Sequence, residues 1–240
     1  MVFVTGLVLF ATLELSGALV EKGRLKARWP LAVMASAMPP LVFFFGPTGH
    51  LWSLLGAIAV AVVIRLVRAG FDASSRASLL ADIGVAIVVL AYIPFLGSFA
   101  LAVHTAPGGV WWVFTGVVVV VSVDVGAYVT GLSFGKTPLA PRISPKKTWE
   151  GFAGSALAAQ IAAVLLGTLV LDLPWWAATV MGVALLGSAT LGDLLESLIK
   201  RDLGIKDISS WLPGHGGFLD RMDSILPSMA VLFVLFQIFG

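Results

Sequence analysis

The chain has 240 residues, of which 59% are hydrophobic and only 12% are charged, and its mean hydropathy is +1.02. Such a composition excludes an ordinary soluble domain, and the lack of cysteine in the sequence excludes disulfides and thiol chemistry. Apolar runs of about 17–25 residues recur, and helices of that length cross a ~30 Å hydrocarbon core. A transmembrane β-barrel would alternate apolar and polar residues, which stretches such as VVVVVSV do not. The sequence therefore predicts an all-α, polytopic transmembrane helix bundle.

About eight membrane spans are predicted. In chain order they cover residues 2–20, 29–46, 50–67, 79–100, 109–132, 152–171, 174–197 and 224–240. The first span lacks a basic start, carries Glu14 and is followed by another span, so we interpret it as mature structure and not as a signal peptide. We count residues 79–100 as the fourth span, with a break or a re-entrant segment at Pro94 and Gly97 as the alternative. We expect a single membrane domain over 1–240, with N-terminal spans in 1–110 and catalytic spans and loops in 111–240.

All fifteen Lys and Arg residues fall in the first, third, fifth and seventh predicted loops. An excess of Lys and Arg marks cytoplasmic loops. We therefore expect a multi-pass protein of the cell membrane with both termini on the non-cytoplasmic side and the active site facing the cytoplasm. Topology and attraction to anionic lipid headgroups are enough to explain loops one and three. Loops five and seven differ because they mix bases with acids, glycines and prolines.

The span before loop five carries Asp124 among apolar residues. A carboxylate inside a membrane is costly and indicates a functional site, although a hydrogen bond to a neighbouring helix is the simpler explanation. Gly126, Gly131 and Gly135 follow it and would let the backbone approach either another helix or a ligand.

Loop five then reads ISPKKTWEG, which predicts a helix with Ser144 as N-cap and Pro145 at its first position. Helix N-termini attract phosphate, and Lys146 and Lys147 would add positive charge there. The simpler alternative is an ordinary capped helix with interfacial lysines.

At the end of span seven, Asp193 and Glu196 are three residues apart and share a helix face. Lys200 follows Glu196 by four residues, so a helical salt bridge is the simpler explanation for Glu196. Asp193 has no basic residue three or four positions away, so a metal or a partner from another segment is needed to explain it.

Loop seven ends in LPGHGGFLDRMDS, residues 212–224, where Asp220 and Asp223 bracket Arg221. Carboxylate oxygens of this kind suit a hard cation such as Mg²⁺. The three glycines around His215 permit backbone turns that bring N–H groups against an anion. For His215 three roles stay open: general acid or base, hydrogen-bond donor to phosphate, or structural hydrogen bonding. Together, carboxylates and clustered bases beside lipid indicate phosphoryl-type transfer to a phospholipid.

Residues 197–223, SLIKRDLGIKDISSWLPGHGGFLDRMD, resemble the signature of the phosphatidate cytidylyltransferases, also called CDP-diacylglycerol synthases. The stretch from Asp124 to Gly151 is similar to the same family. The resemblance implies the reaction CTP + phosphatidate → CDP-diacylglycerol + pyrophosphate. It also implies a divalent metal, usually Mg²⁺, with a second cation left open, and a homodimer in the membrane lipid, with no nucleic-acid partner.

The resemblance also implies roles for individual residues. Asp193 and Asp220 become the metal ligands, and Asp124, Glu196 and Asp223 become candidates for a second shell or a second cation. The groups that would hold the triphosphate and the lipid headgroup are Lys147, Lys200, Arg201 and Arg221. His215 completes the catalytic set beside the two ligands, with its role left open. The substrate-binding set comprises Ser144, Lys146, Lys147, Thr148, Lys206, Gly216 and Gly217.

Two other functions are compatible with parts of the sequence. A related CTP-dependent enzyme could act on an ether lipid or a polyprenol, because the motif residues do not specify which lipid chains the substrate carries. A transporter would explain Asp82 and Asp124 within spans, but not a cationic, glycine-rich cluster confined to one face.

Overall fold

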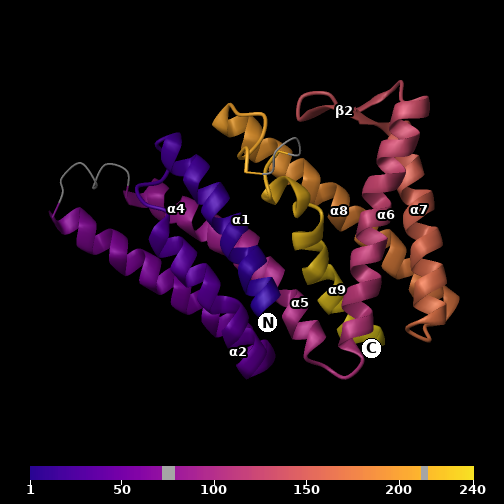
Figure 1. Cartoon of the computed structure of the whole chain (residues 1–240), viewed down its shortest axis with the longest axis horizontal. Coiled ribbons are helices and arrows are strands. Elements are labelled where there is room, and N and C mark those ends of the chain that lie inside the picture. Colours follow the sequence, from indigo (N-terminus) through magenta and orange to yellow (C-terminus); the bar gives the residue numbers. More distant parts are fainter. Residues whose placement is uncertain (72–78, 212–215) are drawn as a thin grey trace. The chain divides into compact units, whose positions relative to one another are not determined.

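The computed structural model describes residues 1–71, 79–211 and 216–240. Within these residues six helices are long and apolar enough to cross a membrane, which confirms the all-α class and identifies an integral membrane protein (Figure 1). They are α1 (Val2–Glu21), α2 (Trp29–Phe71), the continuous run Leu79–His104, α6 (Gly109–Phe134), α7 (Trp149–Leu169) and α8 (Trp175–Leu203). A shorter apolar helix, α9 (Ile225–Phe239), spans roughly 22 Å at 1.5 Å per residue.

The chain divides into two compact units. The first comprises Met1–Ala102 and Asp207–Asp220, and the second comprises Val103–Lys206 and Arg221–Gly240. The described residues of Asp207–Asp220 (207–211 and 216–220), which we call the motif loop, therefore pack with the N-terminal helices although they follow α8 in the sequence.

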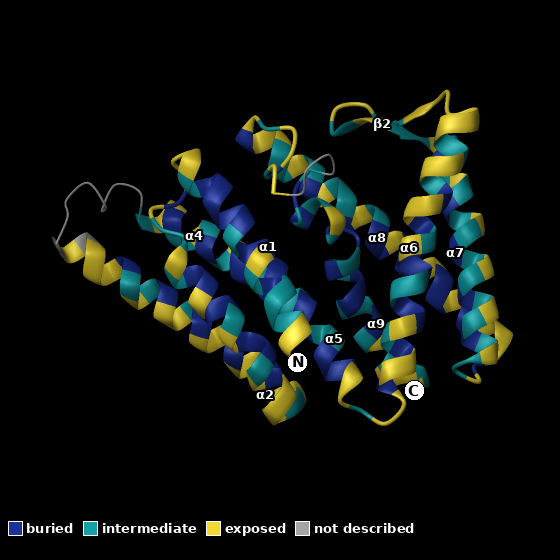
Figure 2. Ribbon diagram, in the orientation of Figure 1, coloured by how far each residue is buried: buried dark blue, intermediate teal, exposed yellow. Residues whose placement is uncertain are grey.

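In the first unit, α2 is two helices joined at Gly46, whose φ of 62° and ψ of −150° are not helical. Leu31 and Ile64 line the same small pocket, so the chain folds back at this point. The reversal has a local cause, because glycine accepts a positive φ and Pro47 cannot donate a helical hydrogen bond. The two arms correspond to the predicted spans 29–46 and 50–67, and their outward faces expose large apolar side chains (Figure 2). The total of eight spans stays a prediction.

The fourth predicted span runs without a break through α4 (Leu79–Leu90), η1 (Ala91–Phe95) and α5 (Leu96–His104). The alternative of an interruption at Pro94 does not hold, because the π-helical turn η1 accommodates the proline inside a continuous run. The Phe95 carbonyl forms a 2.9 Å hydrogen bond with His50 Nε2. Between α2 and α4, the side chains of Arg65 and Asp82 form a buried ion pair at 3.7 Å. Asp82 thus has a structural partner and does not require a transport pathway.

In the second unit, α6 and α7 pack closely along small residues. A Cβ at Gly126 would meet the Gly154 carbonyl and the Ala158 side chain, so this glycine serves a helix contact. The Ser155 hydroxyl donates to the Val123 carbonyl at 2.8 Å across the same interface. On α8 and α9 (Figure 1), a second interhelical hydrogen bond joins the hydroxyls of Ser188 and Ser228 at 2.9 Å.

Loop five forms a two-stranded antiparallel ribbon, β1 (Pro138–Ala140) and β2 (Ser144–Thr148). The expectation that a helix begins at Ser144 and Pro145 is wrong, because both residues lie in β2. The helix α7 is capped instead by Thr148, whose hydroxyl accepts from the Gly151 N–H at 3.1 Å. The ribbon pairing keeps Ser144 in a strand, so the helix begins after Thr148.

The predicted sidedness can be tested with single cysteines, because the chain contains none of its own. We expect Gly240→Cys and Asp172→Cys to react with a membrane-impermeant maleimide in intact cells, since basic residues retain the other loops in the cytoplasm. Lys26→Cys, in the first basic loop, should react only after permeabilisation and serves as the control. Protection of Gly240→Cys in intact cells would show that the number of spans is odd.

Candidate active site

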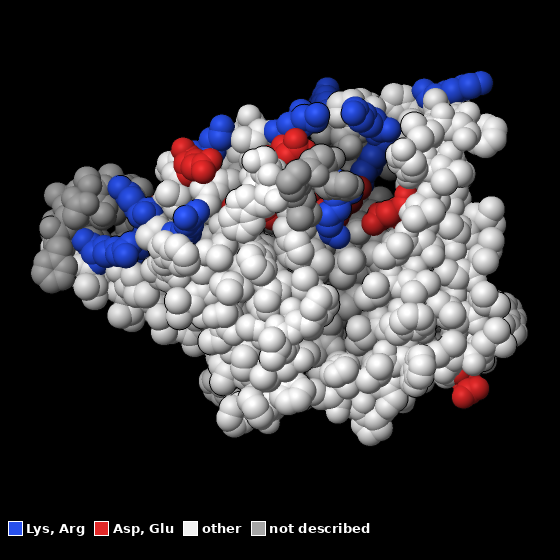
Figure 3. Space-filling view, viewed as in Figure 1, with Lys and Arg blue, Asp and Glu red and all other residues white. Residues whose placement is uncertain are grey.

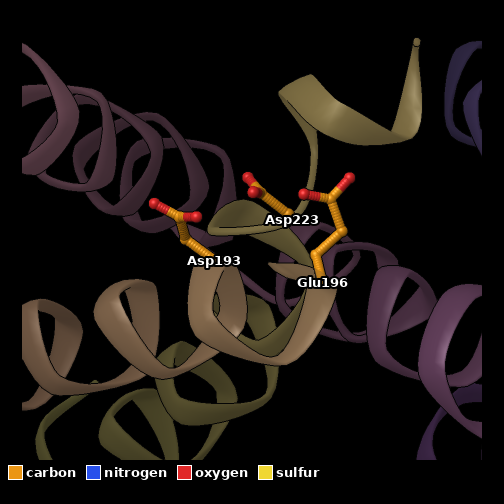
Figure 4. A group of neighbouring side chains, drawn as sticks. All are labelled: Asp193, Glu196 and Asp223. Atoms are coloured by element: carbon orange, nitrogen blue, oxygen red, sulfur yellow. The ribbon is translucent and has the colours of Figure 1, made fainter. Parts of the chain in front are cut away.

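Three carboxylates of the second unit converge on one point. Asp193 and Glu196 lie on α8, and Asp223 lies just before α9. One oxygen from each lies within 4.8 Å of the others, and Figure 4 shows the three side chains turned toward one another. Glu196 is 1% exposed and Asp223 is 8% exposed, so this carboxylate cluster is largely withdrawn from solvent.

The geometry of the carboxylate cluster follows from local sequence. Residues three apart on a helix share a face, which aligns Asp193 with Glu196 as predicted. Asp223 reaches them because Gly192 has no side chain: a Cβ there would meet the Asp223 carbonyl and the Pro227 ring. The glycine thus permits the chain before α9 to lie against α8 at the level of the carboxylates.

The cluster carries strong electrostatic repulsion. Burial above all, and then the negative charge of Asp193, raise the pKa of Asp223 to about 7, while hydrogen bonds with Glu196 and the Ser224 N–H act in the opposite direction. A hydrogen bond between two carboxyl groups requires a proton on one of them. A divalent cation would offset the same repulsion, and a set of carboxylate oxygens is what Mg²⁺ prefers. The residues present therefore fit a magnesium ion.

Two lysines lie beside the carboxylate cluster. Lys147, on β2, forms an ion pair with Asp193, and Lys200 forms one with Glu196 at 2.7 Å. The expected helical salt bridge of Glu196 is therefore confirmed. For Asp193 the structure supplies the second of the two expected explanations, a partner from another segment.

Asp124 lies on α6 and accepts a 2.9 Å hydrogen bond from the Ser224 hydroxyl. Ser224 directly follows Asp223, so Asp124 holds the chain that presents one cluster carboxylate. The simpler explanation given for Asp124 was a hydrogen bond to a neighbouring helix, and its partner Ser224 is the N-cap of α9.

The remaining cationic candidates of this unit are more peripheral. Arg201 donates from Nε to the Ile143 carbonyl at 3.3 Å, which ties the end of α8 to the ribbon. Lys146, Lys206 and Arg221 are exposed. Figure 3 shows that most of the visible charged side chains of this unit lie toward one end of its helices, with one acidic group at the opposite end. Of the expected substrate-binding hydroxyls, Thr148 serves as the N-cap of α7 and Ser144 lies in β2.

In the motif loop of the first unit, the Gly217 N–H donates to the Asp220 carboxylate at 2.7 Å. The expected contact of this N–H with a phosphate oxygen stays a prediction, and it would require the bond to Asp220 to open. Gly216 adopts a φ of 79°, which agrees with the expected glycine turn. The pairing of Asp220 with Asp193 on one metal stays a prediction, and His215 lies outside the described residues, so its three roles stay open.

The sequence prediction does not include Glu14 among the site residues. Its carboxylate is 2% exposed and bonds to the motif loop. The sequence does contain an indication that Glu14 has a role. An acid inside a membrane span is costly, and this argument applies to Glu14 as much as to Asp124.

Comparison with known proteins identifies the class. The profile of the cytidylyltransferase family matches residues 1–239, and the chain belongs to that family. It is therefore a nucleotidyltransferase, and the match includes the N-terminal spans as well as the motif stretches.

Similar proteins share one name. The phosphatidate cytidylyltransferase of Mycobacterium bovis is 37% identical over 95% of this chain and 76% of its own length. That of Mycobacterium leprae is 35% identical over 98% of this chain and 78% of its own length. That of Brucella suis is 40% identical over 61% of this chain and 56% of its own length.

The carboxylate cluster predicts a measurable metal site. We expect the purified protein to bind Mn²⁺, used as a paramagnetic substitute for Mg²⁺, and Asp193→Asn or Asp223→Asn to weaken that binding at least about tenfold, because each removes an anionic oxygen ligand. Electron paramagnetic resonance of free Mn²⁺ measures the binding. Asp172→Asn, in the turn between α7 and α8, is the matched control. Equal binding by all four proteins would show that the cluster holds no metal.

Proposed function

We propose that this chain is a phosphatidate cytidylyltransferase that converts CTP and phosphatidate into CDP-diacylglycerol and pyrophosphate. The observation that carries the proposal is the buried carboxylate cluster with Lys147 and Lys200 beside it. Membership of the cytidylyltransferase family and the names of the relatives support the same reaction.

The reaction needs no protein nucleophile. A non-bridging oxygen of the phosphatidate phosphate attacks the α-phosphorus of CTP and forms a new P–O–P bond. The bond from the α-phosphorus to the oxygen bridging to the β-phosphorus breaks, and that oxygen leaves with pyrophosphate. The phosphatidate phosphate is already anionic at neutral pH, so the main obstacle is the approach of one anion to another.

The side chains address that obstacle by positioning and charge neutralisation. Asp193, Glu196 and Asp223 would hold a magnesium ion, with Asp220 as the further ligand that the family resemblance implies. When bound, the ion would neutralise phosphate oxygens and orient the triphosphate. A second cation belongs to the same proposal.

Lys147 and Lys200 would then bind phosphate oxygens. Each forms an ion pair with a carboxylate of the cluster, which supports a role for both ammonium groups beside the proposed metal ligands. The exposed Arg201 and Arg221 offer planar, bidentate groups that suit a phosphate headgroup arriving from the lipid.

The proposal includes a location. Substrate phosphates would meet the protein at the cytoplasmic face of the cell membrane, which is the side indicated by the basic loops. The active form would be a homodimer within the lipid, with no nucleic-acid partner.

The reaction can be tested with purified protein in micelles that contain phosphatidate, CTP and Mg²⁺. We expect CDP-diacylglycerol and pyrophosphate in equal amounts. Asp193→Asn and Asp223→Asn should lower turnover at least ~100-fold, or roughly 2.7 kcal/mol, because transition-state charge is left uncompensated. Asp172→Asn should retain wild-type turnover. If CTP reacts with an ether lipid or a polyprenyl phosphate but not with phosphatidate, the proposed acceptor is wrong.

The two neighbouring lysines of β2 provide a paired test. Successive side chains on a strand point to opposite faces, and only Lys147 is shown in an ion pair with Asp193. We therefore expect Lys147→Ala to lower kcat/KM for CTP about tenfold or more, and Lys146→Ala to lower it less. Steady-state kinetics at varied CTP concentration measure both. Equal losses would mean that the ribbon contributes only general positive charge.

A further inference from the structure

Glu14 is the most buried carboxylate of the N-terminal helices that the proposed reaction does not use. It lies on α1, two helical turns before the helix ends at Glu21, and is 2% exposed. Burial of an ionised carboxylate is costly unless hydrogen-bond donors surround it. The hydrogen-bond donors that surround Glu14 therefore indicate its structural role.

Among the described residues, the donors to Glu14 come from the motif loop, about two hundred residues later in the sequence. Oε1 accepts from the Ser209 hydroxyl and from the Phe218 N–H at 2.9 Å, and Oε2 accepts from the Leu219 N–H at 2.6 Å. Both backbone amides stand at the start of η2 (Leu219–Arg221), where a helical turn leaves N–H groups without internal partners. Glu14 thus caps this turn from another helix.

The absence of a side chain at Gly217 belongs to the same contact. A Cβ at this position would collide with Glu14 Oε1 and would approach Asp220 Oδ2 to 2.9 Å. The Gly217 N–H is also bonded to Asp220. The glycine therefore lets the two carboxylates lie on either side of one backbone segment.

A second residue of α1 contacts the loop one helical turn earlier. The ring of Phe10 lies 6.4 Å from the ring of Trp211 and 6.4 Å from the ring of Phe218. These aromatic residues lie on both sides of residues 212–215 in the sequence. One face of α1, formed by Phe10 and Glu14, therefore holds the described residues before and after that stretch.

We infer that Glu14 is a positioning residue for the cytidylyltransferase reaction: by binding the Phe218 and Leu219 amides it fixes the turn that presents Asp220. The effect of Glu14 on catalysis rests on the proposed function, whereas its effect on the structure of the turn does not. The hydrogen bonds themselves belong to the first unit and can be measured without turnover.

The informative variant is Glu14→Gln, which keeps the side-chain volume but replaces one acceptor oxygen with an NH₂ group that faces an N–H donor. Hydrogen–deuterium exchange in micelles should show the Phe218 and Leu219 amides exchanging about tenfold faster or more. In the wild type, opening of the turn must break two hydrogen bonds to a carboxylate, and the variant lacks one of these acceptor oxygens. Gly217→Ala places a methyl group against the Glu14 carboxylate and should displace it, so the same faster exchange is expected.

Two controls on α1 separate this effect from general loosening of the helix. Thr12→Val alters a fully buried hydroxyl on the same helix, and Glu21→Gln removes an exposed carboxylate at its end. Neither should change the exchange of the two amides or the turnover number.

Kinetics then test the positioning role. Glu14→Gln should lower kcat about tenfold or more and raise the Mg²⁺ concentration needed for half-maximal activity, while Glu14→Asp, which keeps the charge, should recover part of the loss. Faster exchange with unchanged kcat, or unchanged exchange, would overturn the inference. If the wild type makes no CDP-diacylglycerol, the proposed function fails, while the exchange measurement still decides whether Glu14 holds the loop.

Discussion

The need to compensate negative charge inside a largely apolar protein governs both units. Carboxylates in such surroundings are stable only when cations or hydrogen-bond donors surround them. In the second unit, Asp193 and Glu196 are paired with lysines, and burial, followed by the charge of Asp193, raises the pKa of Asp223. In the first unit, Glu14 is compensated by amide and hydroxyl groups. The two solutions differ in kind, because side-chain ammonium groups can be displaced by a ligand, whereas backbone amides are fixed donors.

Small residues make these arrangements possible. Gly192 lets the backbone before α9 touch α8, and Gly217 leaves room for the Glu14 carboxylate. Gly126 allows α6 and α7 to pack closely beneath the ribbon that carries Lys147. In lipid, helix association depends on close packing more than on exclusion of water, so each of these glycines supports the site through the backbone.

Much of this arrangement could be predicted from the sequence. The length of the apolar runs fixes the all-α membrane class, and the spacing of Asp193 and Glu196 places both on one helix face. The motif residues indicated the family before the fold was known. Long-range pairing could not be read in the same way, because no periodicity in α1 specifies that Glu14 meets Phe218. The prediction at Ser144 was wrong because two local preferences compete there, and strand pairing outweighs N-cap propensity.

The bonds of Glu14 to the motif loop also constrain how the protein is made. Ribosomes synthesise α1 first, but the amides that satisfy its carboxylate lie 204 and 205 residues further along the chain. Until those residues emerge, the nascent helix holds an acid that lacks its final donors in or near the bilayer. The first unit therefore cannot complete its fold co-translationally from its own contiguous segment. Its last step must follow insertion of α8, so the newly made enzyme acquires its ordered motif loop only near the end of synthesis.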